Sequence, residues 1–276
     1  MAMHNENCGN LLMLALETSG RMGSVALAKG EQLLGESTFS GPMRHSAEVF
    51  PAIVGLLDRF GKKPNQIEQV FISAGPGSFT GLRIAVTIAK IMALANHAHI
   101  VAIDTLDCIA ANVINLTATE SSPKLKTQNS KLKTNERLAV ILDAKRGQFF
   151  VAVYEPVSQS DLSLRAKRSN LNQLKTKHSK LKPDYSLIKV LPDCLMTADE
   201  FLDHFAGCGK PIALTGEGLV YYKDKFTNKN VRVLDEKFWN PSAANVYRLG
   251  REMAKSSRFA DPLTLSPNYL RGALDL

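Results

Sequence analysis

The stretch LLMLALETSGRMGSVALA (residues 11–28) begins with an apolar run of strand length that ends at Glu17. A glycine-bearing turn follows, and after it the chain continues as a second strand. The pattern returns in LAVILDAKRGQFFVAVY (residues 138–154), where the apolar run ends at Asp143 and AKRG forms the turn. A strand closed by a carboxylate and followed by a glycine turn therefore occurs twice. This repeat predicts an α/β protein built from two similar lobes.

Periodicity along the rest of the chain gives each lobe the order β-β-β-α-β-α-β-α. In the first lobe we expect a strand at 32–39, helices at 46–60, 80–96 and 105–114, and strands at 69–74 and 99–103. In the second we expect strands at 187–191, 211–216 and 231–234, a helix at 198–205 and a helical stretch near Tyr221. Asn240 as N-cap and Pro241 at the first helical position predict a last helix.

The predicted boundaries follow from these elements. The N-terminal lobe covers 11–115, a basic linker 116–136, the second lobe 137–260 with a basic insertion at 157–189, and a tail 261–276. Two lysine-rich stretches, 117–135 and 157–189, carry the net charge of +8, and the remaining chain is close to neutral. Their composition favours solvated loops. An arm that binds RNA through charge is the alternative.

The overall composition is typical of a globular chain, since 45% of the 276 residues are hydrophobic and 22% are charged. No run approaches the roughly 18 apolar residues of a membrane span, and no secretory signal is visible at the N-terminus. We therefore expect a cytoplasmic protein with no membrane contact. Four cysteines stand far apart without metal-ligand spacing, which predicts free thiols: Cys8, Cys108, Cys194 and Cys208.

Carboxylates and glycine turns at the strand ends form a candidate nucleotide or anion site. Glycine turns can bind phosphate through backbone N–H groups, and a carboxylate can hold Mg²⁺ through water. The alternative is that glycine is simply what tight hairpins require. The candidate residues are Glu17, Thr18, Ser19, Gly75, Gly77, Asp143, Gly216 and Gly218.

The string GPGSFTGLR (residues 75–83) follows a predicted strand and opens a predicted helix. Ser78 or Thr80 can cap that helix, and its first N–H groups could receive an anion. The spacing of a P-loop is absent, because GxxxxGK[ST] does not occur here. Close packing of the helix on the sheet is an equally good explanation of the glycines.

The sequence resembles the TsaB (YeaZ) family in three strings: GPGSFTGLR (75–83), RHSAEVFPAIVGLL (44–57) and LDAKRGQFFVAVY (142–154). That family is part of the ASKHA superfamily of actin, sugar kinases and Hsp70, whose lobes are RNase H-like. LALETS (14–19), TGEG (215–218) and PNYLR (267–271) extend the resemblance over nearly the whole chain outside the lysine-rich stretches. The resemblance implies a two-lobed fold and a non-catalytic role in making N6-threonylcarbamoyladenosine beside the anticodon of tRNAs that read codons beginning with adenine. It implies TsaD and TsaE as partners, TsaC as the supplier of the activated group, tRNA contact only through TsaD, and no cofactor.

The resemblance also implies that the first two helices dock onto TsaD or onto a second copy. Their apolar residues could instead all serve the internal core. His45 is expected to cap or orient the first helix, because Val49 stands where a metal-binding HxxxH pair needs its second histidine, so we expect no metal site. The candidate docking residues are His45, Val49, Ile53, Leu56, Phe60, Ile84, Ile88, Ile91 and Met92.

Two other functions remain open at this point. An active ASKHA-type ATPase or phosphotransferase would use Glu17, Asp143, Gly216 and Gly218. A direct tRNA-binding protein would use the lysine-rich stretches.

Overall fold

The computed structural model describes residues 10–119, 132–133, 135–158, 185–207 and 209–270. Contacts divide the chain into two compact units. Unit 1 comprises Met1–Cys108 with Pro241–Tyr269, and unit 2 comprises Ile109–Asn240 with Leu270–Leu276. Each unit contains one five-stranded mixed sheet.

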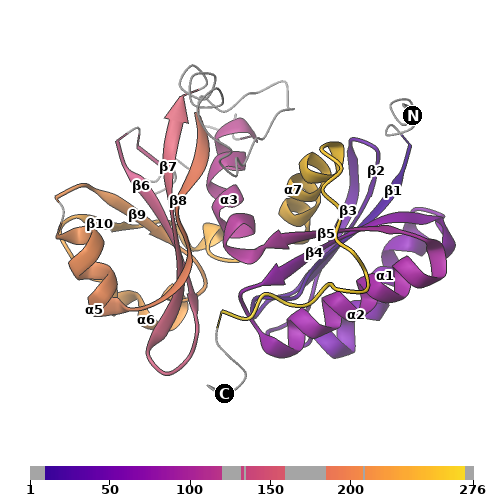
Figure 1. Ribbon diagram of the computed structural model, residues 1–276, viewed down its shortest axis with the longest axis horizontal. Coiled ribbons are helices and arrows are strands. Elements are labelled where there is room, and N and C mark those ends of the chain that lie inside the picture. Colours follow the sequence, from indigo (N-terminus) through magenta and orange to yellow (C-terminus); the bar gives the residue numbers. More distant parts are fainter. Residues whose placement is uncertain (1–9, 120–131, 134, 159–184, 208, 271–276) are drawn as a thin grey trace. The chain divides into compact units, whose positions relative to one another are not determined.

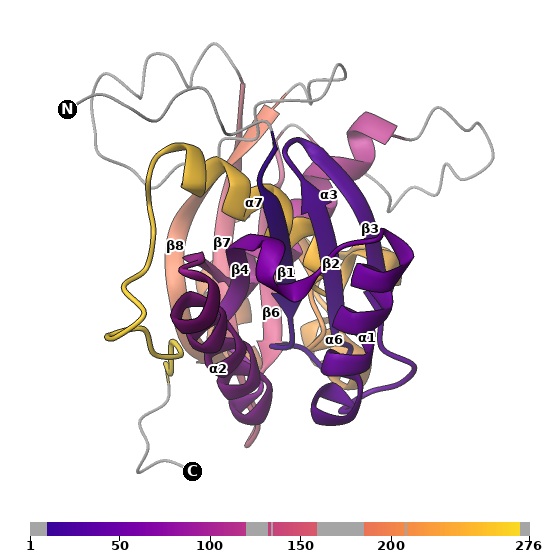
Figure 2. The ribbon, with the colours of Figure 1, turned by 90° about the vertical axis from the view of Figure 1, so that its right-hand side faces the viewer.

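Unit 1 is a sheet with helices on both faces (Figure 1). Its strand order is β3-β2-β1-β4-β5, in which β1 pairs antiparallel with β2 and parallel with β4. Helices α1 and α2 cover one face, and α7 covers the other (Figure 2). The elements are β1 (Leu12–Glu17), β2 (Ser24–Lys29), β3 (Gln32–Thr38), α1 (His45–Arg59), β4 (Ile67–Gly75), α2 (Phe79–Asn96), β5 (His99–Asp104) and α7 (Ala243–Lys255).

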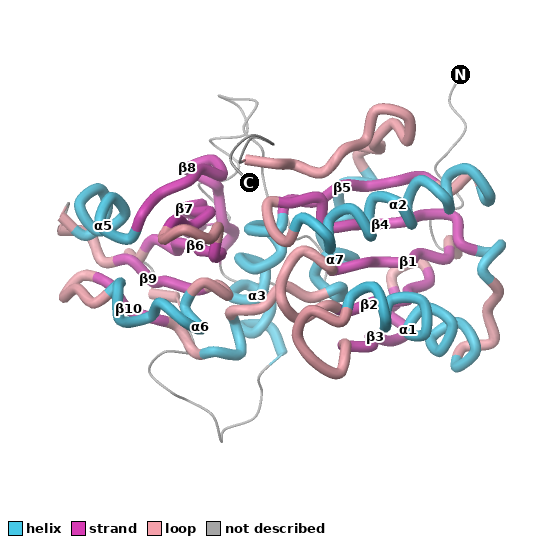
Figure 3. The backbone as a smooth tube through the Cα atoms, turned by 90° about the horizontal axis from the view of Figure 1, so that it is seen from below, coloured by secondary structure: helices cyan, strands magenta, loops and turns pink. Residues whose placement is uncertain are grey.

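Unit 2 repeats the arrangement, because its strand order β8-β7-β6-β9-β10 places the strands in the same relative positions (Figure 3). The predicted β-β-β-α-β-α-β-α order is confirmed in both halves of the chain. The elements are β6 (Arg137–Asp143), β7 (Gln148–Ser158), β8 (Tyr185–Thr197), α5 (Ala198–Phe201), β9 (Ile212–Thr215), α6 (Leu219–Tyr222) and β10 (Val231–Val233). Helix α3 (Thr105–Thr119) begins in unit 1 and continues into unit 2.

The predicted boundary of the second lobe at residue 260 differs from the structure, since the segment 241–260 packs in unit 1. The start of α7 is held there by hydrogen bonds from Ala243 N to Ser24 Oγ (2.8 Å) and from Tyr247 Oη to the Gly30 carbonyl (3.0 Å). The N-cap is Ser242, whose side chain accepts from Asn245 N, and not Asn240 as predicted. The apolar side of α7 therefore closes the second face of the unit 1 sheet.

The lysine-rich stretches lie mostly outside the described residues, so their predicted loop or RNA-binding character stays a prediction. The structure corrects the ends of the second one: β7 runs on to Ser158 and β8 begins at Tyr185, where the two residues pair. Cys8 and Cys208 also lie outside the described residues, whereas Cys108 and Cys194 are free thiols as expected.

Helix α2 corrects the expectation that no segment could cross a membrane. With 18 residues and a mean hydropathy of 1.3, it is long and apolar enough by length and composition alone. It nevertheless packs on the unit 1 sheet, where Leu82, Ala85 and Ala89 are fully buried. Such a helix is also what the core of a globular domain contains.

Candidate docking surface

Helix α2 begins where a glycine-rich loop meets the end of β1. The Ser78 side chain accepts from Gly81 N (3.3 Å), and Ser78 N donates to the Ser19 carbonyl (2.7 Å). A Cβ on Gly77 would lie 2.5 Å from the Ser19 carbonyl oxygen, and one on Gly81 would lie 1.7 Å from that of Thr18. The glycines therefore allow a close approach of α2 to this turn, which is the structural explanation of the GPGSFTGLR string.

The inner sides of α1 and α2 form the core of unit 1 with the sheet. Four predicted docking residues belong to this inner side and are at most 4% exposed: Val49, Ile53, Leu56 and Ile88. Their side chains already pack in this core, so Val49, Ile53 and Leu56 leave little surface for a partner, whereas Ile88 also borders the groove beside α2. Phe60, Ile84 and Met92 are half-buried and pack against the same core.

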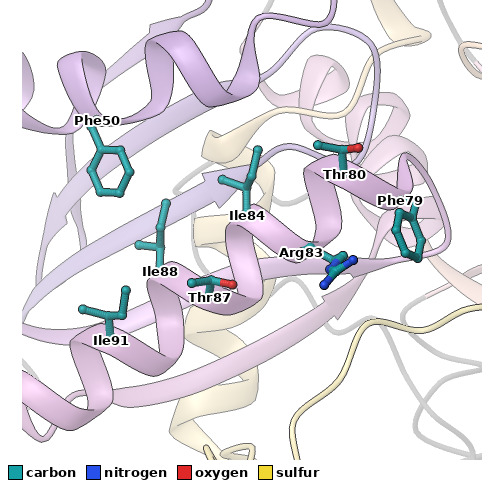
Figure 4. Close-up of a pocket in the computed structure, with 8 residues that line it drawn as sticks. All are labelled: Phe50, Phe79, Thr80, Arg83, Ile84, Thr87, Ile88 and Ile91. Carbon is teal, nitrogen blue, oxygen red and sulfur yellow. The ribbon is translucent and has the colours of Figure 1, made fainter.

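Figure 4 shows apolar and polar side chains of α2 around a pocket, with Phe50 of α1 beside them. A groove of about 350 Å³ runs along α2 and is bordered on the α1 side by Phe50. Its lining comprises Phe50, Phe79, Thr80, Arg83, Ile84, Thr87, Ile88 and Ile91. Phe50 is 57% exposed and Ile91 53%, and Val54 and Leu94 beside them are also exposed. Of the predicted docking residues, Ile84, Ile88 and Ile91 line this groove, and of these Ile91 is exposed.

The sequence analysis missed Phe50, Val54, Phe79 and Leu94. The signal was present in the sequence, because the apolar arc of residues 46–60 is wider than one contact with a sheet needs. We call the exposed apolar residues Phe50, Val54, Phe79, Ile91 and Leu94 the outer face of α1 and α2.

His45 lies inside unit 1 and is 3% exposed, so it cannot contact a partner. Its Nε2 donates to the Gly20 carbonyl (2.9 Å), its ring packs edge-on against Phe39, and its Nδ1 has no hydrogen-bond partner. Burial lowers the pKa of His45, because an imidazolium would be poorly solvated there. The side chain ties the start of α1 to the turn after β1, which agrees with an orienting role.

Glu17, the carboxylate that ends β1, is fully buried. Its Oε1 accepts from Ser19 N (2.7 Å), Ser19 Oγ (2.5 Å) and Gly20 N (3.3 Å), and its Oε2 accepts from Ser73 Oγ. Burial raises the pKa of Glu17, and these hydrogen bonds oppose the rise. Thr18 is also buried and donates from Oγ1 to the Gly81 carbonyl (2.7 Å). This arrangement is that of a satisfied structural cluster, since all the donors come from unit 1.

The candidate nucleotide residues of unit 2 also have local partners. Asp143 accepts from Lys145 N (2.8 Å) and Lys145 Nζ (2.6 Å). Gly216 has a φ of +123°, and a Cβ there would lie 2.0 Å from the Ile141 carbonyl oxygen, so close packing of β9 on β6 requires this glycine. Gly218 N donates to the same carbonyl (3.3 Å). Within unit 1, Gly75 approaches the Asn268 carbonyl.

Among the residues that the structure describes, no group of three or more His, Cys, Asp or Glu side chains could hold a metal ion.

The tRNA threonylcarbamoyladenosine biosynthesis protein TsaB of Bacillus subtilis is 25% identical to this chain over 264 residues, covering 95% of this chain and 94% of that protein. The protein of the same name from Haemophilus influenzae is 32% identical over 115 residues, which is 41% of this chain and 47% of that protein. The YeaZ structure from Pseudomonas aeruginosa superposes with a TM-score of 0.67 at 19% identity, covering 94% of this chain and all of that one. The chain is similar over nearly its whole length to proteins named TsaB and YeaZ.

A family model described as "TsaD: tRNA N6-adenosine threonylcarbamoyltransferase" also matches residues 42–170 of this chain. The superposition on YeaZ concerns the fold alone. The two similar five-stranded mixed sheets, each with helices, confirm the predicted α/β fold with two lobes.

Proposed function

We propose that this chain takes part in forming N6-threonylcarbamoyladenosine on tRNA as a non-catalytic subunit that docks onto TsaD. The names of its relatives support the pathway. The exposed outer face of α1 and α2 supports the docking, and it is the observation on which the proposal depends. In this proposal TsaE joins the pair, TsaC supplies the activated group, tRNA is contacted through TsaD, and the complex works in the cytoplasm.

The outer face is suited to docking because its side chains do not contribute to the core of unit 1. The unit 1 core is complete without it, since the inner residues of α1 and α2 already cover the sheet. Contiguous exposed apolar side chains beside a groove mark interaction sites on proteins that otherwise keep such residues apart. Interface energy concentrates in such a central apolar patch.

The bonding of Glu17 supports a structural role over ATP hydrolysis. Its carboxylate oxygens are both engaged by donors from unit 1, so the residue is not poised to hold a metal-bound water. ATP turnover by the isolated chain, abolished by Glu17→Ala while the fold persists, would favour the phosphotransferase alternative instead.

The test is a reconstituted modification reaction with TsaD, TsaC, TsaE, tRNA, threonine, bicarbonate and ATP, run with and without this chain. We expect omission to abolish or strongly slow the modification. In the same assay and in direct binding to TsaD, Val54→Asp should fail. Val220→Asp is the matched control, because it places the same change at a valine of similar exposure in unit 2 (43% against 52%).

Full-rate modification without the chain would refute the supporting role. Equal binding of TsaD by both valine variants would refute the docking surface. Modification unchanged after deletion of 120–131 and 159–184 would exclude a tRNA-binding role for the lysine-rich stretches.

A further inference from the structure

We propose that unit 2 contacts tRNA directly, through Arg146 in the turn between β6 and β7 and through the exposed ring of Tyr221 on α6. Arg146 binds a phosphate of the RNA backbone, and Tyr221 stacks on an unpaired base. The inference rests on the proposed function, which brings the chain to a tRNA, and it adds a direct contact to the one made through TsaD.

The turn between β6 and β7 has an unfavourable backbone. Its φ angles are +67° at Lys145, +56° at Arg146 and +77° at Gly147. Gln148 N donates to the Lys145 carbonyl (3.1 Å), so Arg146 and Gly147 are the central residues of a turn with positive φ at both, as in type I′. Asn-Gly is preferred at these two positions, because most other side chains are crowded in the left-handed region. The chain therefore has an arginine where the turn alone favours asparagine.

The two cations of this turn differ in their partners. Lys145 is paired with Asp143, whose carboxylate accepts from Lys145 N (2.8 Å) and Lys145 Nζ (2.6 Å). Arg146 is exposed, and among the described residues it forms no hydrogen bond or ion pair. Residues held in an unfavourable backbone region cluster at binding sites, and the planar guanidinium matches the oxygens of a phosphate. Arg146 is therefore placed to bind an anion from solution.

Helix α6 lies beside this turn. Strands β6 and β9 are parallel, so the turn after β6 and the helix after β9 lie at the same edge of the unit 2 sheet. A Cβ on Gly218, the residue before α6, would lie 3.3 Å from Asp143 N. The Tyr222 ring contacts the ring of Phe149, which follows the turn, with centroids 5.4 Å apart. The turn and α6 are therefore neighbours on this edge.

Helix α6 and the residues after it supply an aromatic ring and two cations. Tyr221 is 59% exposed. Lys223 and Lys225 are exposed on either side of Asp224, and Lys225 Nζ lies 5.5 Å from the centroid of the Tyr222 ring. Cations beside an exposed aromatic ring suit unpaired nucleic acid, because the cations pair with phosphates and the ring stacks on a base.

This edge suits RNA better than it suits another protein. Among the described residues of unit 2, the exposed large hydrophobic side chains are Val190, Val220 and Tyr221. Three such side chains are too few for the apolar centre that a protein interface needs. A nucleic acid needs no such centre, since contacts with its phosphates supply much of the affinity. In the proposed function tRNA is the polyanion that this chain meets.

The experiment measures binding of the full chain, without TsaD, to a fluorescently labelled tRNA that reads a codon beginning with adenine, at several salt concentrations. Arg146→Asn should weaken binding and reduce the slope of log affinity against log salt by about one, because one phosphate contact is lost. The same variant should unfold at a higher urea concentration than wild type, because Asn-Gly suits the turn. Arg146→Lys should keep the slope, since it keeps the charge.

The aromatic contact has its own variants. Tyr221→Ala should weaken binding at least about fivefold with an unchanged salt slope, because stacking carries no charge. Tyr221→Phe keeps the ring and should bind as wild type. Lys210→Gln is the matched control for charge and should also bind as wild type, because this exposed lysine precedes β9 and lies at the opposite edge of the sheet.

Several outcomes would overturn the direct contact and leave docking onto TsaD standing. They are a wild-type chain that binds no tRNA at low salt, an Arg146→Asn variant with the salt slope of wild type, and equal losses in Arg146→Asn and Lys210→Gln. If Arg146→Asn and Tyr221→Ala lose TsaD but keep tRNA, the edge is a protein surface and the inference is wrong. The proposed function fails separately, when modification runs at full rate without the chain.

Discussion

Replacing Gly81 by alanine should destabilise unit 1, because α2 can approach β1 only without a side chain at this position. The new Cβ would lie 1.7 Å from the Thr18 carbonyl oxygen, which is backbone and cannot rotate away. Overpacking of this kind typically costs about 1–3 kcal/mol. Displacing α2 also strains the hydrogen bond from Thr18 Oγ1 to the Gly81 carbonyl, a contact that contributes about 0.5–1.5 kcal/mol. We therefore expect a loss of roughly 2–4 kcal/mol.

The matched control is Gly55→Ala on α1, where a Cβ meets nothing within 4 Å. That variant should gain about 0.5–1 kcal/mol, because alanine loses less conformational entropy in a helix than glycine does. The measurement is urea unfolding followed by far-UV circular dichroism, with hydrogen exchange of the α2 amides to locate the change. A Gly81→Ala protein within about 0.5 kcal/mol of wild type would refute the close approach of α2 to the turn after β1.

Three further predictions follow from burial. The free energy of unfolding of the wild type should fall as the pH rises above 4.5, because burial raises the pKa of Glu17 in the folded state and ionisation of its carboxyl then opposes folding. In Glu17→Gln this fall should be smaller, and urea unfolding at several pH values measures the difference. Val49→Asp should lower the free energy of unfolding by about 3–5 kcal/mol, because it buries a carboxylate. Phe50→Asp, at a side chain that is 57% exposed, should keep the melting temperature of the wild type in calorimetry but lose binding to TsaD. Gly216→Ala should loosen unit 2 by at least about 1 kcal/mol, measured as faster hydrogen exchange near Ile141.

The repeated strand, carboxylate and glycine turn predicted the architecture correctly because these signals are local. The hairpins β1–β2 and β6–β7 form where the apolar runs flank the turns. The position of α7 could not be predicted in the same way. Its amphipathic pattern shows that one side is buried, but both sheets offer an apolar face on which that side could pack. The hydrogen bonds to Ser24 and Gly30 place α7 on the sheet of unit 1, and these contacts cannot be read from the sequence.

The docking site stays a prediction, but the side of α1 that the sequence pattern placed outward is buried. Consecutive residues on a helix differ by about 100° in direction, so Val49 and Phe50 cannot both face the sheet. The sequence shows that both side chains are apolar, but it does not show which of the two packs against the strands. Val49 is fully buried and Phe50 is not. The nucleotide site stays a prediction as well, and the structure adds that Glu17 accepts internal hydrogen bonds and that Gly216 lies close to the Ile141 backbone.

Helix α2 has an exposed apolar side as well as the side that packs on the sheet. A helix that is apolar on all sides is found in a membrane or between two protein layers. The hydropathy of α2 meets the first description, yet one of its sides already packs on a sheet. Unit 1 provides only that one layer, and Leu94 on the other side is 83% exposed. A partner that covers this side, as in the docking proposal, would therefore bury apolar side chains next to Arg83 and Lys90, the charged residues of the helix.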